Sequence, residues 1–279
     1  MVKKTSIILL PILALLLAQC EAPTRGCLDI EATNFEFTAD KPCEDECCKY
    51  PNLVVVINQE YENTFFQENK VYQNDLNQWF RIKSAAFYLS DFKLQQQGEF
   101  YPISDSLRTS VFGATAADTI DKVFLDDIIL ARRIPLEYPV GTFKKSGFFD
   151  QIDFKVGLDA AQNGIIPRKT PSGHPLNKQT DSLWLSQSEG FVWMQIVVAK
   201  DSAAATIADT LRFTSADFGA APALFQKTGN FEHITGFDFK VGLKIDYAKL
   251  VKGVDFANTG KDKWKIKMVS NLSSTFDVQ

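Results

Sequence analysis

The chain has 279 residues, of which 23% are charged, with 30 Lys and Arg against 34 Asp and Glu and a formal net charge of −4 at pH 7. Nucleic-acid binding requires clustered basic residues, so this scattered and mildly acidic charge argues against it. Aromatic residues make up 12% of the chain and include 23 phenylalanines, which favours strands over helices.

The N-terminus predicts export. Lys3 and Lys4 form a short basic region, an apolar run covers residues 6–18, and Cys20 follows it as in a lipobox. The run is too short to span a bilayer as an uncleaved anchor. Residues 1–19 are therefore expected to be a lipoprotein signal peptide, and the mature chain is expected to be tethered to a membrane by lipid on Cys20. This places it at the bacterial cell envelope, on the periplasmic or surface face of the outer membrane.

All five cysteines precede residue 49. If one carries the lipid, an even number remains in an exported chain, which predicts disulfides. Four cysteines allow three pairings, and the two adjacent residues are not expected to pair with each other. A zinc knuckle is the alternative, although no histidine lies nearby. Residues 20–51 are thus expected to form a tether with a disulfide knot, and the cysteines are Cys20, Cys27, Cys43, Cys47 and Cys48.

Residues 52–279 predict one all-β domain, an antiparallel β-sandwich with long loops and few short helices. Apolar and polar residues alternate along several runs, as expected for strands with one buried face. A short helix is expected over residues 247–251 after the capping residue Asp246, and turns or single helical turns are expected over residues 203–209 and 215–224. The expected strands are 53–58, 79–90, 91–96, 122–130, 149–158, 190–199, 209–215, 236–245 and 263–269.

One hexapeptide, Asp-Phe-Lys-Val-Gly-Leu, occurs at residues 153–158 and again at 238–243. A duplicated strand would produce this repeat. Two unrelated strands in the same half-buried environment would also produce it, because alternation with a period of two strongly restricts such sequences.

The segment 157–198 contains most residues with binding chemistry. There is no nucleophile elbow, P-loop, dinucleotide fingerprint or zincin motif, so no enzyme activity is predicted. The chain has two histidines, His174 and His233, and imidazole suits copper, zinc or nickel. Proline at position 175 restricts the backbone of His174, which either holds the imidazole at the rim of a loop or simply shapes a turn.

Seven ordered blocks resemble the MbnP-like family of exported, β-rich proteins, which are often lipoproteins. The resemblance covers approximately residues 52–270 and is specific because several blocks occur in the same order. The blocks are residues 87–92, 149–159, 173–177, 181–184, 190–193, 230–234 and 243–246.

The resemblance implies a mononuclear copper site made by two histidines and a tryptophan that a di-haem partner enzyme oxidises to kynurenine. Opening the indole ring creates an amine and a carbonyl that can coordinate a metal. By position, His174 and His233 would be ligands and Trp184 the modified residue, with Trp193 as the alternative. Three further positions would support the site: Tyr88, Asp159 and Asn177.

The chain departs from the family pattern at Ser186, where a second aromatic residue is common, and at Phe191, where a tyrosine is usual. The sequence therefore supports two functions. The first is an extracytoplasmic, lipid-anchored copper-binding protein for uptake, storage or delivery of copper. The second is a cell-envelope binding or scaffold module for a protein or glycan partner.

Overall fold

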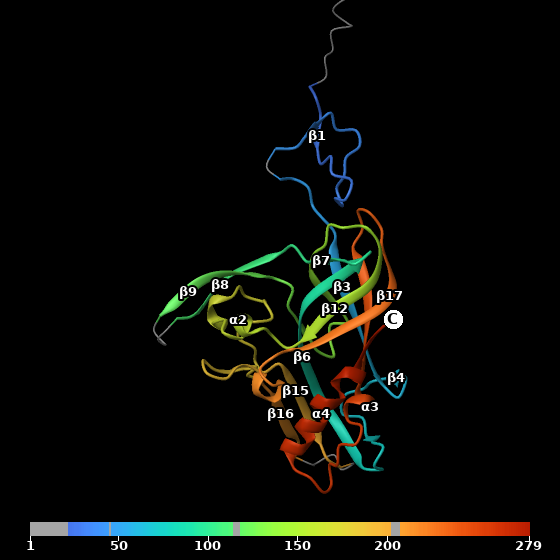
Figure 1. Cartoon of the computed structure of the whole chain (residues 1–279), viewed down its shortest axis with the longest axis vertical. Coiled ribbons are helices and arrows are strands. Elements are labelled where there is room, and N and C mark those ends of the chain that lie inside the picture. Colours follow the sequence, from blue (N-terminus) through green and yellow to red (C-terminus); the bar gives the residue numbers. More distant parts are fainter. Residues whose placement is uncertain (1–21, 45, 114–117, 202–206) are drawn as a thin grey trace, which may run out of the picture.

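Strand β6 (Trp79–Gln96) is at the centre of the largest sheet (Figure 1). The computed structural model describes residues 22–279 apart from 45, 114–117 and 202–206, so Cys20 and the predicted signal peptide lie outside the described residues. The sheet has the order β16-β15-β6-β12-β17, and all of its pairs are antiparallel. Three short strands also pair with β6. The other strands are β5 (Tyr72–Gln73), β7 (Glu99–Pro102), β10 (Ile129–Ala131), β12 (Gly147–Val156), β15 (Met194–Ala199), β16 (Asp209–Phe213) and β17 (Ala223–His233).

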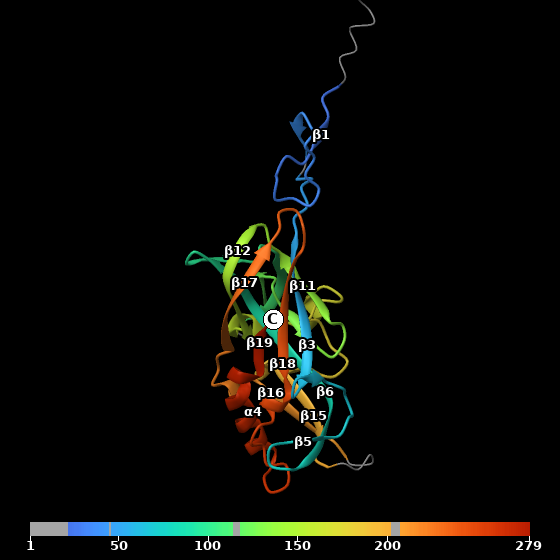
Figure 2. The same cartoon turned by 90° about the vertical axis from the view of Figure 1, so that its right-hand side faces the viewer.

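A second sheet packs against the first (Figure 2). Its order is β11-β3-β18-β19, and β4 pairs with β3. Rings from the two sheets meet in the core: Phe87 lies 5.5 Å from Phe276, and Phe149 lies 5.8 Å from Phe239, between ring centroids. The predicted β-sandwich is therefore confirmed. The strands are β3 (Asn52–Tyr61), β4 (Thr64–Phe65), β11 (Glu137–Thr142), β18 (Phe239–Asp246) and β19 (Phe276–Val278).

The remaining elements are small pairs of strands and short helices. The paired strands are β1 (Arg25–Gly26) with β2 (Lys41–Pro42), β8 (Ser106–Phe112) with β9 (Thr119–Leu125), and β13 (Trp184–Ser186) with β14 (Gly190–Phe191). The helices are α2 (Ala160–Asn163), α3 (Tyr247–Leu250), α4 (Lys261–Thr275) and the 3-10 helices η1 (Pro167–Lys169) and η2 (Ser215–Phe218). Among the described residues, no helix is both long and apolar enough to cross a bilayer.

Strand β6 is buried on both faces, and this positions the loops that follow it. Phe87 and Leu89 point into the core between the two sheets. Ala86 and Tyr88 alternate with them and point into a second apolar cluster, which the segment 157–193 forms over the outer face of the sheet. Side chains alternate between faces along a strand, so the residues at 86 and 88 fix where that segment packs.

Two predictions about individual elements are wrong. Residues 263–269 were expected to form a strand because Trp264, Ile266 and Met268 alternate, but they belong to helix α4, where Ile266 is 71% exposed. The buried residues of α4 follow helical spacing instead. The sheets were expected to be antiparallel throughout, but β3 and β18 run parallel. A parallel pair needs a long crossover connection. Here the connection is the chain between β3 and β18, which contains all strands of the first sheet.

Other expected elements are partly confirmed. The helix at 247–251 is α3, and the carboxylate of Asp246 accepts hydrogen bonds from the first turn as predicted. The predicted strand 122–130 is split into β9 and β10. Residues 215–224 contain η2, and β17, which follows, was not predicted. The expected turn at 203–209 lies mostly outside the described residues.

The N-terminal cysteines form two disulfides, Cys27 to Cys48 and Cys43 to Cys47. Three of these sulfurs form the one metal-like cluster of His, Cys, Asp and Glu side chains in the described residues. Because all are bonded in disulfides, no thiolate is left for the zinc alternative. This module lies at one end of the molecule (Figure 1). It contacts the sandwich through a hydrogen bond of 2.8 Å from Ser146 Oγ to Glu31 Oε1.

Candidate functional site

Tyr88 connects the sheet to the predicted binding loop. Its ring is fully buried, and its hydroxyl donates a hydrogen bond of 2.9 Å to the carbonyl oxygen of Pro175. Burial raises the pKa of the Tyr88 phenol, so this group stays a proton donor. The amide of Asn177 closes the loop on itself by donating to the carbonyl oxygens of Thr170 and Pro171. Tyr88 and Asn177 therefore position the backbone around His174.

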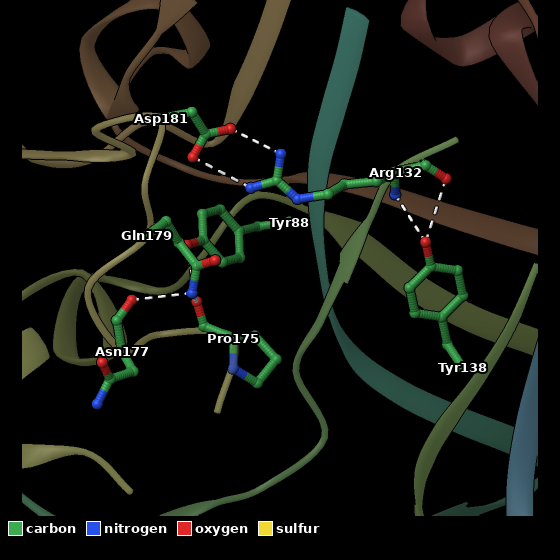
Figure 3. A network of polar contacts seen from close by, with 7 residues as sticks. All are labelled: Tyr88, Arg132, Tyr138, Pro175, Asn177, Gln179 and Asp181. Atoms are coloured by element: carbon green, nitrogen blue, oxygen red, sulfur yellow. Dashed lines mark hydrogen bonds and ion pairs between the residues drawn. The ribbon is translucent and has the colours of Figure 1, made fainter. Parts of the chain in front are cut away.

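An ion pair fixes the far end of the same loop (Figure 3). Arg132 binds both carboxylate oxygens of Asp181, at 2.6 and 3.1 Å. The backbone N–H of Arg132 also donates to the hydroxyl of Tyr138, which donates back to the Arg132 carbonyl. Hydrogen bonding to Asp181 raises the pKa of Arg132. Nothing in the sequence marked Arg132, because its partner is 49 positions away.

We expect Tyr88→Phe to lower the free energy of unfolding by about 1 kcal/mol, the net value of one buried hydrogen bond. The loss is moderate because Gln179 Nε2 also donates to the Pro175 carbonyl. Urea unfolding measures the change, and amide exchange should be faster in residues 173–181. Tyr101→Phe is the control, since that hydroxyl bonds only to Glu99 at the surface. Equal losses in both variants would contradict the assigned role of Tyr88.

The imidazole of His174 lies beside a carboxylate. Its Nε2 is 2.9 Å from Asp126 Oδ1, and its Nδ1 accepts a hydrogen bond of 3.0 Å from the backbone N–H of Leu176. Nδ1 is therefore the acceptor, and Nε2 carries the proton. The side chain is 9% exposed. Both residues line a cavity of about 550 Å³, together with Asp105 and Arg132.

His233 has a different environment at the end of β17. It is buried, and its ring stacks on Phe239 with centroids 5.0 Å apart. Its Nδ1 lies 2.7 Å from the Lys145 carbonyl oxygen, and its Nε2 lies 2.9 Å from that of Phe237. Both nitrogens thus face acceptors, so at least one bond must break before either could bind a metal.

Trp184 lies in β13 and is half-buried, with its ring 6.3 Å from that of Phe112. It lines a second cavity, which contains no histidine. The alternative tryptophan, Trp193, is buried, and its indole N–H donates to Asn163 Oδ1 at 3.0 Å. The interpretation of Trp193 as a core residue is therefore confirmed.

Asp159 acts as a helix cap. Its carboxylate accepts a hydrogen bond of 2.6 Å from the backbone N–H of Gln162, and the Gln162 side chain accepts from the Asp159 backbone N–H. These reciprocal bonds form a capping box for α2. Among the described residues, no hydrogen bond joins Asp159 to either imidazole, so the predicted support of an imidazole by Asp159 is not seen.

One loop thus brings Tyr88, Asn177 and His174 together. Within the described part of the chain, no hydrogen bond or ring contact joins the two imidazoles, or either of them to Trp184. Gln179 lines both cavities, so these two sites are neighbours. Nothing in the sequence marks Asp126, which follows β9 and belongs to no motif.

The fold and these contacts define an all-β sandwich that presents a loop cluster on the outer face of one sheet. The family model described as MbnP matches residues 50–269, and the chain belongs to this family. The resemblance seen in the ordered sequence blocks is therefore confirmed. The solved structure of MbnP from Methylosinus trichosporium is similar with a TM-score of 0.39 and 11% identity, covering 71% of this chain and 76% of that one. No curated protein matches the chain.

Proposed function

We propose that the chain is a lipid-anchored copper-binding protein of the bacterial cell envelope, which holds copper for uptake, storage or delivery and is not an enzyme. Family membership supports a copper-related role, and the lipobox-like sequence before Cys20 supports the anchor. The structural observation that carries the proposal is the pairing of His174 Nε2 with Asp126 Oδ1 beside a cavity.

The candidate ligand residues differ in how well their atoms are placed to bind copper. The nitrogen of His174 and the oxygen of Asp126 are close enough to bind one ion once the proton on Nε2 has left. A nitrogen and oxygen donor set suits Cu(II), and bound copper would supply a redox-active Lewis acid there. His233 does not fit while both its nitrogens face carbonyl oxygens, and Trp184 lines the neighbouring cavity. The set of His174, His233 and oxidised Trp184 therefore requires rearrangement.

We expect the metal-free mature chain to bind one equivalent of copper. His174→Gln should abolish stoichiometric binding, because glutamine keeps hydrogen-bonding groups but lacks an imidazole donor. Asp126→Asn should also weaken binding strongly, because it replaces the charged oxygen donor beside His174 Nε2 with a neutral amide. Titration with Cu(I) and with Cu(II) against a competing chelator measures both effects. Unchanged binding in both His174→Gln and His233→Gln would contradict the proposal.

Two further measurements address the rest of the proposed site. Loss of binding in His233→Gln without unfolding would support the ligand set that includes this residue. Intact mass of the protein from its native host would detect oxidation of Trp184 to kynurenine, and Trp184→Phe is the matched control. Detection of that mass would also support a di-haem oxidising partner.

A second candidate function is favoured by a separate observation. The cavity lined by Trp184 is about 590 Å³ and contains cationic and aromatic side chains. This composition suits an organic ligand better than a metal, as expected for a cell-envelope binding module.

A further inference from the structure

The cavity beside Trp184, here called the cationic cleft, has the dimensions of a small-molecule site. Its volume of about 590 Å³ lies within the range of known ligand pockets. Three separate parts of the chain form it: the ends of β8 and β9, the segment around η1, and residues 178–187. It lies over the sheet face that Tyr88 and the second apolar cluster anchor, so its walls rest on a packed core.

Positive charge is concentrated at this cleft. Arg168, Lys169 and Lys178 line it, and no acidic side chain is among the described residues that do. All three are exposed, and none forms an ion pair or a side-chain hydrogen bond with another described residue. The chain as a whole carries a formal charge of −4. Three unneutralised cations around one concave surface produce a local positive potential that attracts anions.

The same cleft offers flat apolar surface. The rings of Trp184 and Phe112 lie 6.3 Å apart with an angle of 23° between their planes. Both are half-buried, so part of each ring faces the cleft. The indole N–H of Trp184 has no hydrogen-bond partner among the described residues and remains available as a donor. An indole face stacks favourably on another ring, and its N–H can bind an oxygen of the same ligand.

We infer that the cationic cleft binds a small organic anion in which a carboxylate is attached to an aromatic or sugar ring. The cations would bind the carboxylate with charge-assisted hydrogen bonds, and Trp184 and Phe112 would pack on the ring. This inference needs Trp184 as an intact indole and does not depend on copper binding by His174 and Asp126, since neither an imidazole nor a carboxylate is among the described residues that line the cleft.

Calorimetric titration of the metal-free mature chain tests the ligand class. The probes are 4-hydroxybenzoate and galacturonate, with the neutral 4-hydroxybenzamide and galactose as their counterparts. We expect one of the acids to bind with one equivalent and its neutral counterpart to bind at least about tenfold more weakly. The acid that binds distinguishes the aromatic from the sugar source. Absence of binding by both acids at millimolar concentration, or equal binding of acid and neutral counterpart, would overturn the inference.

Matched variants test the location. The triple variant Arg168→Gln, Lys169→Gln, Lys178→Gln should weaken binding of the acid at least about tenfold. The control is Lys252→Gln, Lys263→Gln, Lys267→Gln, which removes the same charge from exposed positions after β18. Equal weakening in both would show a nonspecific charge effect and would overturn the assignment to this cleft.

The aromatic contact has its own pair of variants. Trp184→Ala should weaken binding, whereas Trp79→Ala, at a site where the side chain is 51% exposed, should not. Trp184→Phe keeps a ring and should retain part of the affinity, which distinguishes lost stacking from misfolding. Ligand binding should persist in His174→Gln, so failure of the copper proposal and failure of this inference can be told apart. An unchanged affinity in Trp184→Ala would overturn the stacking role.

Discussion

Gly157→Ala is expected to destabilise the protein by about 2 to 6 kcal/mol, the sum of backbone strain and overpacking. Gly157 has a φ of +113°, a conformation that L residues rarely adopt. A Cβ atom there would lie 2.5 Å from Trp193 Cε3. The indole cannot easily move, because it is buried and its N–H is bonded to Asn163. A loss of this size is a large fraction of the stability of an ordinary domain.

The matched control is Gly173→Ala. This glycine also has a positive φ, of +85°, but no atom lies within 4 Å of the added methyl group. Gly173→Ala should therefore lower the free energy of unfolding only by the backbone strain, about 1 to 2 kcal/mol. Urea unfolding of both variants gives the difference, which isolates the contact with Trp193. Equal losses would show that this contact contributes nothing. In a double variant with Trp193→Leu, the cost of Gly157→Ala should fall.

Sequence alternation predicted many of the strands correctly because one face of each is buried. The repeated hexapeptide shows the limit of such patterns. Its first copy ends β12 and continues into Gly157, with antiparallel neighbours on both sides, whereas the second begins at the start of β18, beside the parallel strand β3. The two copies lie in different sheets. This favours the interpretation that similar burial, and not similar pairing, explains the repeat.

The site was predictable as a region but not as a set of contacts. The loop containing His174 was identified from its composition and from the family resemblance. Its partner Asp126 lies 48 positions away and is brought close only by the packing of the segment after β9. His233 was considered equivalent to His174 in the sequence, but β17 carries it into a core of phenylalanine rings. Tertiary contacts, which no local motif encodes, make this difference.

Asp127→Asn is expected to remove the part of the pH dependence of stability between about pH 4 and pH 6 that comes from burial of this carboxyl group. The side chain of Asp127 is fully buried. One carboxylate oxygen accepts a hydrogen bond of 2.9 Å from the Phe92 N–H, and the other has no partner. Burial raises the pKa of Asp127 from 3.8 to about 6, although backbone N–H groups of Asp91 and Phe92 oppose the increase.

The direction of the effect follows from proton binding. The folded state holds this proton more tightly than the unfolded state, so the contribution of Asp127 to stability falls as pH rises from about 4 to about 6 and then stays constant. This rise of about two units in the pKa of Asp127 corresponds to a loss of roughly 3 kcal/mol in the free energy of unfolding. Asp91 acts in the opposite direction: burial would raise its pKa, but hydrogen bonds from Lys155 and Lys93 lower it. Its stabilising effect is lost only at lower pH.

Urea unfolding of the metal-free protein from pH 4 to pH 8 tests the prediction for Asp127. The difference in unfolding free energy between Asp127→Asn and the wild type should change by up to about 3 kcal/mol in favour of the variant between pH 4 and pH 7. Asp150→Asn, which removes a carboxylate from an exposed position of β12, is the control for the loss of one acidic side chain. Parallel curves for Asp127→Asn and the wild type would mean that the carboxyl titrates alike in both states, because water or an altered contact then reaches its second oxygen. A positive result would identify Asp127 as an acid that the fold buries at a cost near neutral pH, next to the residue proposed to bind copper.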